Sequence, residues 1–336
     1  MNSLKCERMN NTQTVFLELV KAGLWGNGNL DIRIDGTTDW NYIYRLAQEQ
    51  SVQGLVLQGI EWFKNHNLSL GIPQVLLLQW IGEVQLIEQR NKAMNQFIAE
   101  LVEKMRAADI YSILVKGQGV AQCYEKPLWR PSGDVDLLQS EVNYKKAKEL
   151  LLPLSSSNKN EERYSQHLGM SIGQWYVEIH GSLRTGLSTK VDREVDVVQN
   201  SVFIGGNTRS WQNEGTLVFL PAPTEDVFLV FTHFIKHFYI EGMSLRQICD
   251  WCRLLWTYRD SLNYGNLELW INKAGLKKEW QAFYNLVSRY LGMPDLDSQD
   301  SQARMSDHRS SARFMFHDSR YDKKAEKLMA FILRGY

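Results

Sequence analysis

Two aspartates in the middle of the chain are the first candidates for chemistry. Asp134 and Asp136 lie two residues apart in the largely apolar segment DVDLLQ (134–139). Side chains two apart on a strand point to the same face, so both carboxylates project together while Val135 and Leu137 pack on the opposite face. Adjacent carboxylates repel each other unless a cation lies between them. Because Mg²⁺ usually takes one or two carboxylates together with substrate phosphate oxygens, the pair is a candidate magnesium site.

A third carboxylate lies in the alternating segment QWYVEIH (174–180). If this segment is a strand, Glu178 shares a face with His180, and the apolar residues form the other face. If that strand also neighbours DVDLLQ (134–139), Glu178 adds a third carboxylate to the aspartate pair. His180 could then touch a substrate or orient a ligand, or it could be a buried imidazole with its hydrogen bonds satisfied.

The aspartate pair also has a simpler interpretation. Most Asp-x-Asp sequences lie on a solvated strand or turn and bind nothing. Here the neighbours Val135, Leu137 and Leu138 predict a strand that is part of the core. Exposure to solvent alone does not readily explain an acidic face on a strand of the core. This context favours a metal site.

The elements that must position these carboxylates form a short mixed region. Residues 112–116 (SILVK) are apolar and lead into a glycine-containing turn, which predicts a buried strand. The aspartate segment is the next expected strand, and a helix is expected at 144–154. A hairpin is predicted from 163–172 and 173–183, and another strand at 216–221.

Helical periodicity dominates both sides of this region. We expect a helical N-terminal region at 1–106, an α/β core at 107–221 and a helical C-terminal region at 222–336. Within the last region, the polar residues 295–320 predict a loop or mobile segment. The fold class is therefore α+β, with a small mixed central sheet embedded in helical regions.

Composition excludes several classes of protein. The 336 residues carry 38 basic and 38 acidic side chains, and this zero net charge argues against long nucleic acid or an anionic membrane as a partner. With 44% apolar and 23% charged residues, the chain is neither disordered, collagen-like nor a coiled coil. Four cysteines suggest a reducing compartment, and no apolar run of about 18 residues is present. We expect a cytoplasmic protein.

Three segments together carry a family resemblance. Residues 115–117 (VKG), 130–138 (RPSGDVDLL) and 177–180 (VEIH) resemble the uncharacterised nucleotidyltransferase family of the polymerase-beta-like nucleotidyltransferase superfamily. Members of that family read LKG, RPxxD(I/V)DLL and VE(I/L)H at these places. Further matches are Trp40, Leu46, Ala47, His233, His237, Arg246 and Asp250.

The resemblance implies a metal site for phosphoryl transfer. Asp134 and Asp136 would hold two metal ions, Mg²⁺ or Mn²⁺, about 4 Å apart, and Glu178 would complete the site. The chain departs from the superfamily in two places. The turn at 117–119 reads GQG where Gly-Ser or Gly-Gly is usual, and the third carboxylate is Glu where many members have Asp.

The resemblance also implies residues that bind the nucleotide. Gly117 would let the backbone approach the triphosphate, and Lys116 and Arg130 would neutralise the charge that develops during transfer. Gly133 and His180 are assigned to the same nucleotide-binding group. The implied reaction moves a nucleoside monophosphate from a nucleoside triphosphate to an acceptor hydroxyl and releases pyrophosphate. The acceptor, a small molecule, a glycan or a protein, is not defined by the sequence.

Two other functions stay open from the sequence. The first is a non-catalytic module of the same fold that binds a nucleotide or a metal. The second is a helical interaction protein stabilised by zinc, because Cys249 and Cys252 follow His233 and His237 with metal-like spacing. Such spacings also arise from helix packing alone. The complete set of three carboxylates favours the enzyme.

Overall fold

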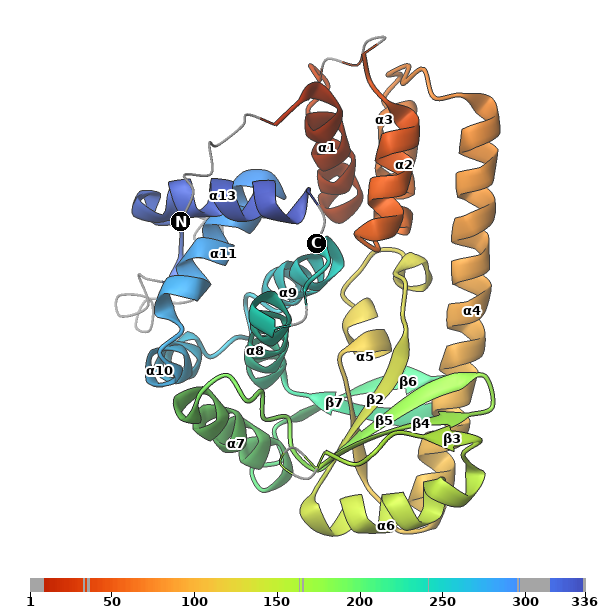
Figure 1. Ribbon diagram of the computed structural model, residues 1–336, viewed down its shortest axis with the longest axis vertical. Coiled ribbons are helices and arrows are strands. Elements are labelled where there is room, and N and C mark those ends of the chain that lie inside the picture. The colour runs from red at the N-terminus through yellow and green to blue at the C-terminus, as the bar shows by residue number, and fades with distance from the viewer. Residues whose placement is uncertain are drawn as a thin grey trace.

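The computed structural model describes residues 9–32, 34, 37–162, 164, 166–240, 242–294, 296 and 315–334. These residues form an α+β fold, in which one mixed sheet lies in the lower part of Figure 1 and most helices from the two ends of the chain lie above it. The predicted fold class is therefore confirmed. Most of the segment 295–320, which we expected to be a loop, lies outside the described residues.

Helices precede and follow the strands, and three more lie between strands. The described helices are α1 (Asn11–Trp25), α2 (Trp40–Glu49), α3 (Gln53–Asn65), α4 (Gln74–Ala107), α5 (Gly117–Ala121), α6 (Glu141–Leu151), α7 (Thr189–Phe203), α8 (Pro223–Ile240), α9 (Leu245–Thr257), α10 (Tyr264–Ala274), α11 (Lys277–Tyr290) and α13 (Asp322–Ile332). Short 3-10 turns are η1 (Pro127–Trp129), η2 (Leu152–Leu154) and η4 (Ser319–Tyr321). None of the described helices is both long enough and apolar enough to span a membrane.

The sheet is built from the middle of the chain. Its strands are β1 (Ser112–Val115), β2 (Asp134–Gln139), β3 (Ser157–Asn158), β4 (His167–Ile172), β5 (Trp175–His180), β6 (Thr208–Asn213) and β7 (Thr216–Pro221). Their order is β3-β4-β5-β2-β1-β7-β6. The pairs β2/β5 and β1/β7 are parallel and the other pairs are antiparallel. β2 and β5, the two strands that carry the carboxylates, are therefore direct neighbours.

The two faces of the sheet have different roles. Val135 and Leu137 of β2 and Val177 and Ile179 of β5 are buried in a cluster with residues of α4 and α6. Burial of these side chains fixes the strand register, because a shift of one residue would turn the apolar set outward. The carboxylates consequently face away from α4 and α6, as the alternation in the sequence predicts.

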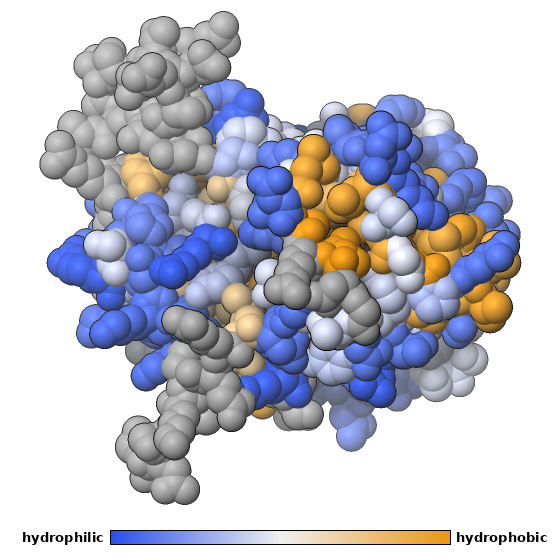
Figure 2. Space-filling model, turned by 90° about the horizontal axis from the view of Figure 1, so that it is seen from above, coloured by the Kyte–Doolittle hydropathy of each residue, from blue (hydrophilic) through white to orange (hydrophobic). Residues whose placement is uncertain are grey.

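The helices before the sheet region and the helices after it pack against each other. One hydrophobic cluster contains residues of α1, α2 and α3 together with residues of α8 to α11 and α13. In Figure 1, α4 runs beside the N-terminal helices and continues to the sheet. Figure 2 shows that the face of the molecule seen from above is mostly hydrophilic, with apolar residues in its upper centre and near its right edge. The division at 106 and 221 stays a prediction.

Candidate active site

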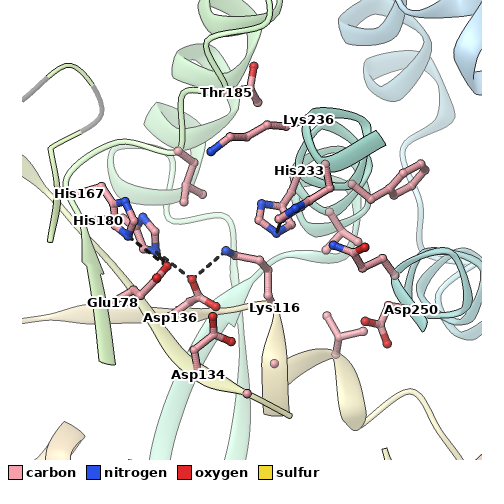
Figure 3. Close-up of a pocket in the computed structure, with 18 of the residues that line it drawn as sticks. Lys116, Asp134, Asp136, His167, Glu178, His180, Thr185, His233, Lys236 and Asp250 are labelled. Carbon is pink, nitrogen blue, oxygen red and sulfur yellow. Dashed lines mark hydrogen bonds and ion pairs between the residues drawn. The ribbon is translucent and has the colours of Figure 1, made fainter. Parts of the chain in front are cut away.

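A cavity of about 510 Å³ lies over the carboxylate face of β2 and β5. Residues of β4, α8, α9 and the loop after β5 complete its walls (Figure 3). All eight residues assigned above to metal or nucleotide line this cavity: Lys116, Gly117, Arg130, Gly133, Asp134, Asp136, Glu178 and His180. The fold thus brings together segments that are more than sixty positions apart in the sequence.

The three carboxylates form one cluster. In the parallel pairing of β2 with β5, Asp136 lies directly opposite Glu178, and Asp134 lies on the same face of β2. One oxygen from each of the three carboxylates lies within 4.8 Å of the others. This separation lets them share a cation, and it makes them repel one another when no cation is present.

The pKa values of the aspartates reflect this crowding. Repulsion from Asp136, together with burial, raises the pKa of Asp134 to about 6. Burial alone would raise the pKa of Asp136 too, but Lys116 and His180 hold it well below its ordinary value. Lys116 Nζ donates to Asp136 Oδ1 at 2.7 Å, and His180 Nε2 donates to the same oxygen at 2.9 Å. Asp136 is therefore ionised, and Asp134 is the carboxylate whose charge is least compensated.

The turn after β1 aims Lys116 at the carboxylates. Lys116 has φ 58° and ψ −144°, a backbone conformation that is costly for a residue with a side chain, and Gly117 follows with φ 41°. A methyl group at Gly117 would lie 3.5 Å from the carbonyl oxygen of Asp134, whereas one at Gly133 would meet open space. Backbone strain at a cavity wall is typical of functional sites.

Two histidines face the carboxylates from neighbouring strands. His167 of β4 pairs across the ladder with His180 of β5, and their rings stack with centroids 4.7 Å apart and planes 5° apart. His167 Nε2 lies 3.0 Å from Glu178 Oε2, and His180 Nε2 lies 3.7 Å from the same oxygen. Contact with Glu178 raises the pKa of His167, whereas burial lowers the pKa of His180. His167 was not assigned to the site from the sequence.

Arg130 lines the cavity wall, but its guanidinium is engaged with α9. Nε and Nη2 of Arg130 donate to the two carboxylate oxygens of Asp250, each at 2.7 Å, and Tyr124 donates to the same carboxylate at 2.7 Å. Burial alone would lower the pKa of Arg130, but Asp250 raises it above its ordinary value. Nη1 also donates to Ser132 Oγ at 2.8 Å. Arg130 thus anchors the segment that leads into β2, a structural task that the sequence did not indicate.

The loop after β5 is held by α7. Asp192 Oδ1 accepts hydrogen bonds from the backbone N–H groups of Thr185 and Gly186 at 2.8 and 3.1 Å, and from the Thr185 hydroxyl at 3.0 Å. Arg184 forms an ion pair with Asp196 at 2.6 Å. Since Arg184 and Thr185 line the cavity, these bonds fix one wall of it.

The two histidines and two cysteines with metal-like spacing in the sequence do not form a zinc site within the described residues. Nε2 atoms of His233 and His237 lie 3.0 Å apart on α8. Cys249 and Cys252 are free thiols buried in the core formed by the helices. Within the part of the chain that the structure describes, neither cysteine belongs to a cluster of three or more side chains able to hold a metal. Helix packing accounts for their spacing.

Comparison with known protein families identifies the family of this chain. A family profile described as "Uncharacterised nucleotidyltransferase" matches residues 36–292, about three quarters of the chain. The chain therefore belongs to this family.

A solved structure of an antigenic nucleotidyltransferase-like protein from Paracoccidioides brasiliensis is also similar to this chain. The two are 12% identical, and the match covers 59% of this chain and 92% of that one with a TM-score of 0.35. A similarity this low carries no inference about activity. Comparison with curated proteins gave no significant match.

Proposed function

We propose that the protein transfers a nucleoside monophosphate from a nucleoside triphosphate to an acceptor hydroxyl and releases pyrophosphate. The observation that carries the proposal is the cluster of Asp134, Asp136 and Glu178, whose oxygens lie within 4.8 Å of one another at a cavity of about 510 Å³. Membership of the nucleotidyltransferase family supports the reaction class.

The chemistry of the cluster fits a divalent ion, Mg²⁺ or Mn²⁺. Its donors are carboxylate oxygens on rigid strands, which are the ligands that Mg²⁺ prefers. Their mutual repulsion, which raises the pKa of Asp134 to about 6, would be relieved by a bound cation. Asp134, Asp136 and Glu178 would hold the metal, which would supply charge neutralisation at the transferred phosphoryl group.

Other residues of the cavity would bind and orient the triphosphate. Lys116 places a cation next to the carboxylates, where it can neutralise phosphate charge. Gly117 and Gly133 leave the backbone accessible for close approach of phosphate oxygens. Arg130, held by Asp250, keeps the segment before β2 in place and so fixes the position of the aspartates.

The acceptor would enter from the side of α8 and α9, which complete the cavity opposite β5. The walls there combine basic and polar side chains with the apolar Val230 and Phe234. This mixture suits a small molecule, a glycan or a protein side chain that bears a hydroxyl group. Free buried thiols at Cys123, Cys249 and Cys252 are consistent with action in a reducing compartment such as the cytoplasm.

Incubation with labelled nucleotides tests the proposal. Each of the four common nucleoside triphosphates, labelled at the α-phosphate, is incubated with the full chain, Mg²⁺ or Mn²⁺ and a cell extract, and labelled products are then identified. We expect one class of acceptor to become labelled by the parent and by Asp109→Asn, a control that removes an exposed carboxylate outside the cavity. Asp134→Asn should leave the acceptor unlabelled. Nucleotide binding without any transfer would instead indicate a non-catalytic binding module.

A further inference from the structure

Among the residues that the structure describes, one arginine in the wall of the cavity has no carboxylate partner. Arg246 is the second residue of α9 and is partly buried. Its Nη1 donates to the backbone carbonyl oxygen of Pro131 at 3.1 Å, the one hydrogen bond of this side chain to the described residues. Its Nε is shielded from solvent and has no partner among them. Arg130 and Arg184, the other arginines of the wall, are each paired with an aspartate.

The surroundings of Arg246 are unfavourable for a cation. Burial, followed by repulsion from Arg130, lowers the pKa of Arg246, while Asp250 and Asp134 attract it from beyond ion-pair distance. Both carboxylate oxygens of Asp250 already accept hydrogen bonds from Arg130. Arg246 also lies in the first turn of a 13-residue helix, where the helix dipole favours negative charge. An anion bound next to Arg246 would relieve each of these costs.

The side chain of Arg246, and not the end of its helix, is available to bind such an anion. The backbone N–H of Leu245 donates to Gln50 Oε1 at 2.8 Å, and that of Arg246 donates to the Gln50 carbonyl oxygen at 3.2 Å. A capping box between Ser244 and Gln247 occupies further groups of the first turn. The guanidinium carries five N–H donors, most of which remain free for a ligand in the cavity.

Arg246 lies beside the segment that leads into the acidic cluster. Its hydrogen bond to Pro131 links it to residues 131–133, and Asp134, the next residue, begins β2. In the view of Figure 3, Asp250 of α9 and the clustered carboxylates lie on opposite sides of Lys116. The cavity thus has an acidic side, which suits a metal, and a basic side at the start of α9, which suits an anion. A metal-bound polyphosphate carries both kinds of partner in one ligand.

We propose that Arg246 binds the part of the nucleoside triphosphate that leaves as pyrophosphate. The carboxylates would hold the metal at the transferred phosphoryl group, and the two leaving phosphates carry most of the negative charge. A planar guanidinium can donate to two phosphate oxygens at once. Arg130, for which the resemblance implied this charge neutralisation, is engaged by Asp250, and Arg246 supplies the charge instead. The inference rests on the proposed function and names the residue that binds its leaving group.

Binding of inorganic pyrophosphate to the full chain tests the inference, because it needs neither an acceptor nor turnover. In calorimetric titration with excess Mg²⁺, Arg246→Gln should bind pyrophosphate at least about tenfold more weakly than the parent, the effect expected for losing a hydrogen bond between charged groups. Arg246→Lys keeps the charge without the planar group and should fall between the two. Arg259→Gln removes an arginine that follows α9 outside the cavity wall, and it should bind like the parent. Equal affinity in the parent and in Arg246→Gln would overturn the inference.

Two further measurements separate this role from other roles of Arg246. Thermal unfolding without ligand should give Arg246→Gln the same unfolding temperature as the parent or a higher one, because the variant removes a charge that Arg130 repels. A lower unfolding temperature with unchanged pyrophosphate affinity would show that Arg246 only supports Pro131, and would overturn the inference. A nucleoside monophosphate, which lacks the leaving phosphates, should bind the parent and Arg246→Gln equally. A tenfold loss for the monophosphate would place Arg246 elsewhere in the site and contradict the assignment.

Failure of this inference can be distinguished from failure of the proposed function. If the parent and Arg246→Gln transfer label with the same KM for the nucleoside triphosphate and bind pyrophosphate equally, this inference alone is wrong. If pyrophosphate binding depends on Arg246 but no acceptor becomes labelled, the proposed function alone is wrong.

Discussion

Replacing Asp134 by asparagine should stabilise the metal-free protein. Repulsion from Asp136 and burial raise the pKa of Asp134 from an ordinary 3.8 to about 6. The unfolded chain therefore releases this proton at lower pH than the folded protein does. Between about pH 4 and pH 6 the folded state binds more protons, so the free energy of unfolding falls as the pH rises, and the contribution is fully lost above pH 6.

The size of the effect follows from the same pKa values. Each pKa unit corresponds to about 1.4 kcal/mol, so a change from 3.8 to about 6 corresponds to about 3 kcal/mol as an upper bound. Asp134→Asn removes the charge, and at pH 7 in a chelating buffer it should be more stable than the parent by up to that amount. The difference should shrink as the pH falls from about 6 to about 4 and vanish below that, where Asp134 is protonated in both states.

Urea unfolding of the parent and the variant between pH 4 and pH 8 measures this difference. Asp109→Asn, which removes an exposed carboxylate, serves as the matched control and should follow the parent. Added Mg²⁺ should stabilise the parent and narrow its difference from Asp134→Asn, because a bound cation relieves the repulsion. A variant that is less stable than the parent at pH 7 without metal, or a difference that does not change with pH, would refute this reasoning.

Three further substitutions probe the site and its support. Glu178→Gln should lower label transfer at least about tenfold, and combined with Asp136→Asn it should cost little more than the stronger single change, because the residues act as one unit. Val177→Thr, buried on the opposite face of β5, should lower the free energy of unfolding by about 1–3 kcal/mol through an unsatisfied hydroxyl, yet keep normal activity per folded molecule. Asp250→Ala should destabilise the protein by about 3–5 kcal/mol, because it leaves the Arg130 guanidinium buried without its partner; thermal unfolding that matches the parent would contradict this.

Local patterns in the sequence were enough to predict the strands of the site and the faces of their side chains. The alternation in residues 134–139 and 174–180 placed Asp134, Asp136 and Glu178 on polar faces, and the structure gives each strand that orientation. These predictions succeeded because the apolar residues of each strand must face α4 and α6. From the sequence, the two strands could be called neighbours only as an assumption. Their adjacency depends on the parallel pairing of β2 with β5, which neither segment indicates by itself.

The sequence could not predict which residues far apart along the chain come into contact. His167 reaches the site because a two-residue turn, at 173–174, sets the hairpin register that pairs it with His180. That register can be derived only once both strand ends are known. The role of Arg130 was predicted as charge neutralisation at the phosphate, but Asp250, 120 residues further along the chain, engages its guanidinium. The residues next to Arg130 in the sequence give no indication that Asp250 is its partner.

Some elements were missed for local reasons. Strand β6 (Thr208–Asn213) is an edge strand with mostly polar and partly exposed residues, so its sequence lacks the apolar alternation of the inner strands. Helix α8 begins at Pro223, and the Thr224 hydroxyl accepts a hydrogen bond from the backbone N–H of Asn263.

Binding of Mn²⁺ measured by electron paramagnetic resonance tests the central claim most directly, namely that Asp134, Asp136 and Glu178 hold a metal together with a nucleotide. The parent should bind Mn²⁺, and a non-hydrolysable nucleoside triphosphate should tighten that binding by adding phosphate oxygens as ligands. Asp134→Asn should weaken the nucleotide-dependent binding at least about tenfold, while Asp109→Asn should not. Identical Mn²⁺ binding by the parent and Asp134→Asn, with or without nucleotide, would contradict the account.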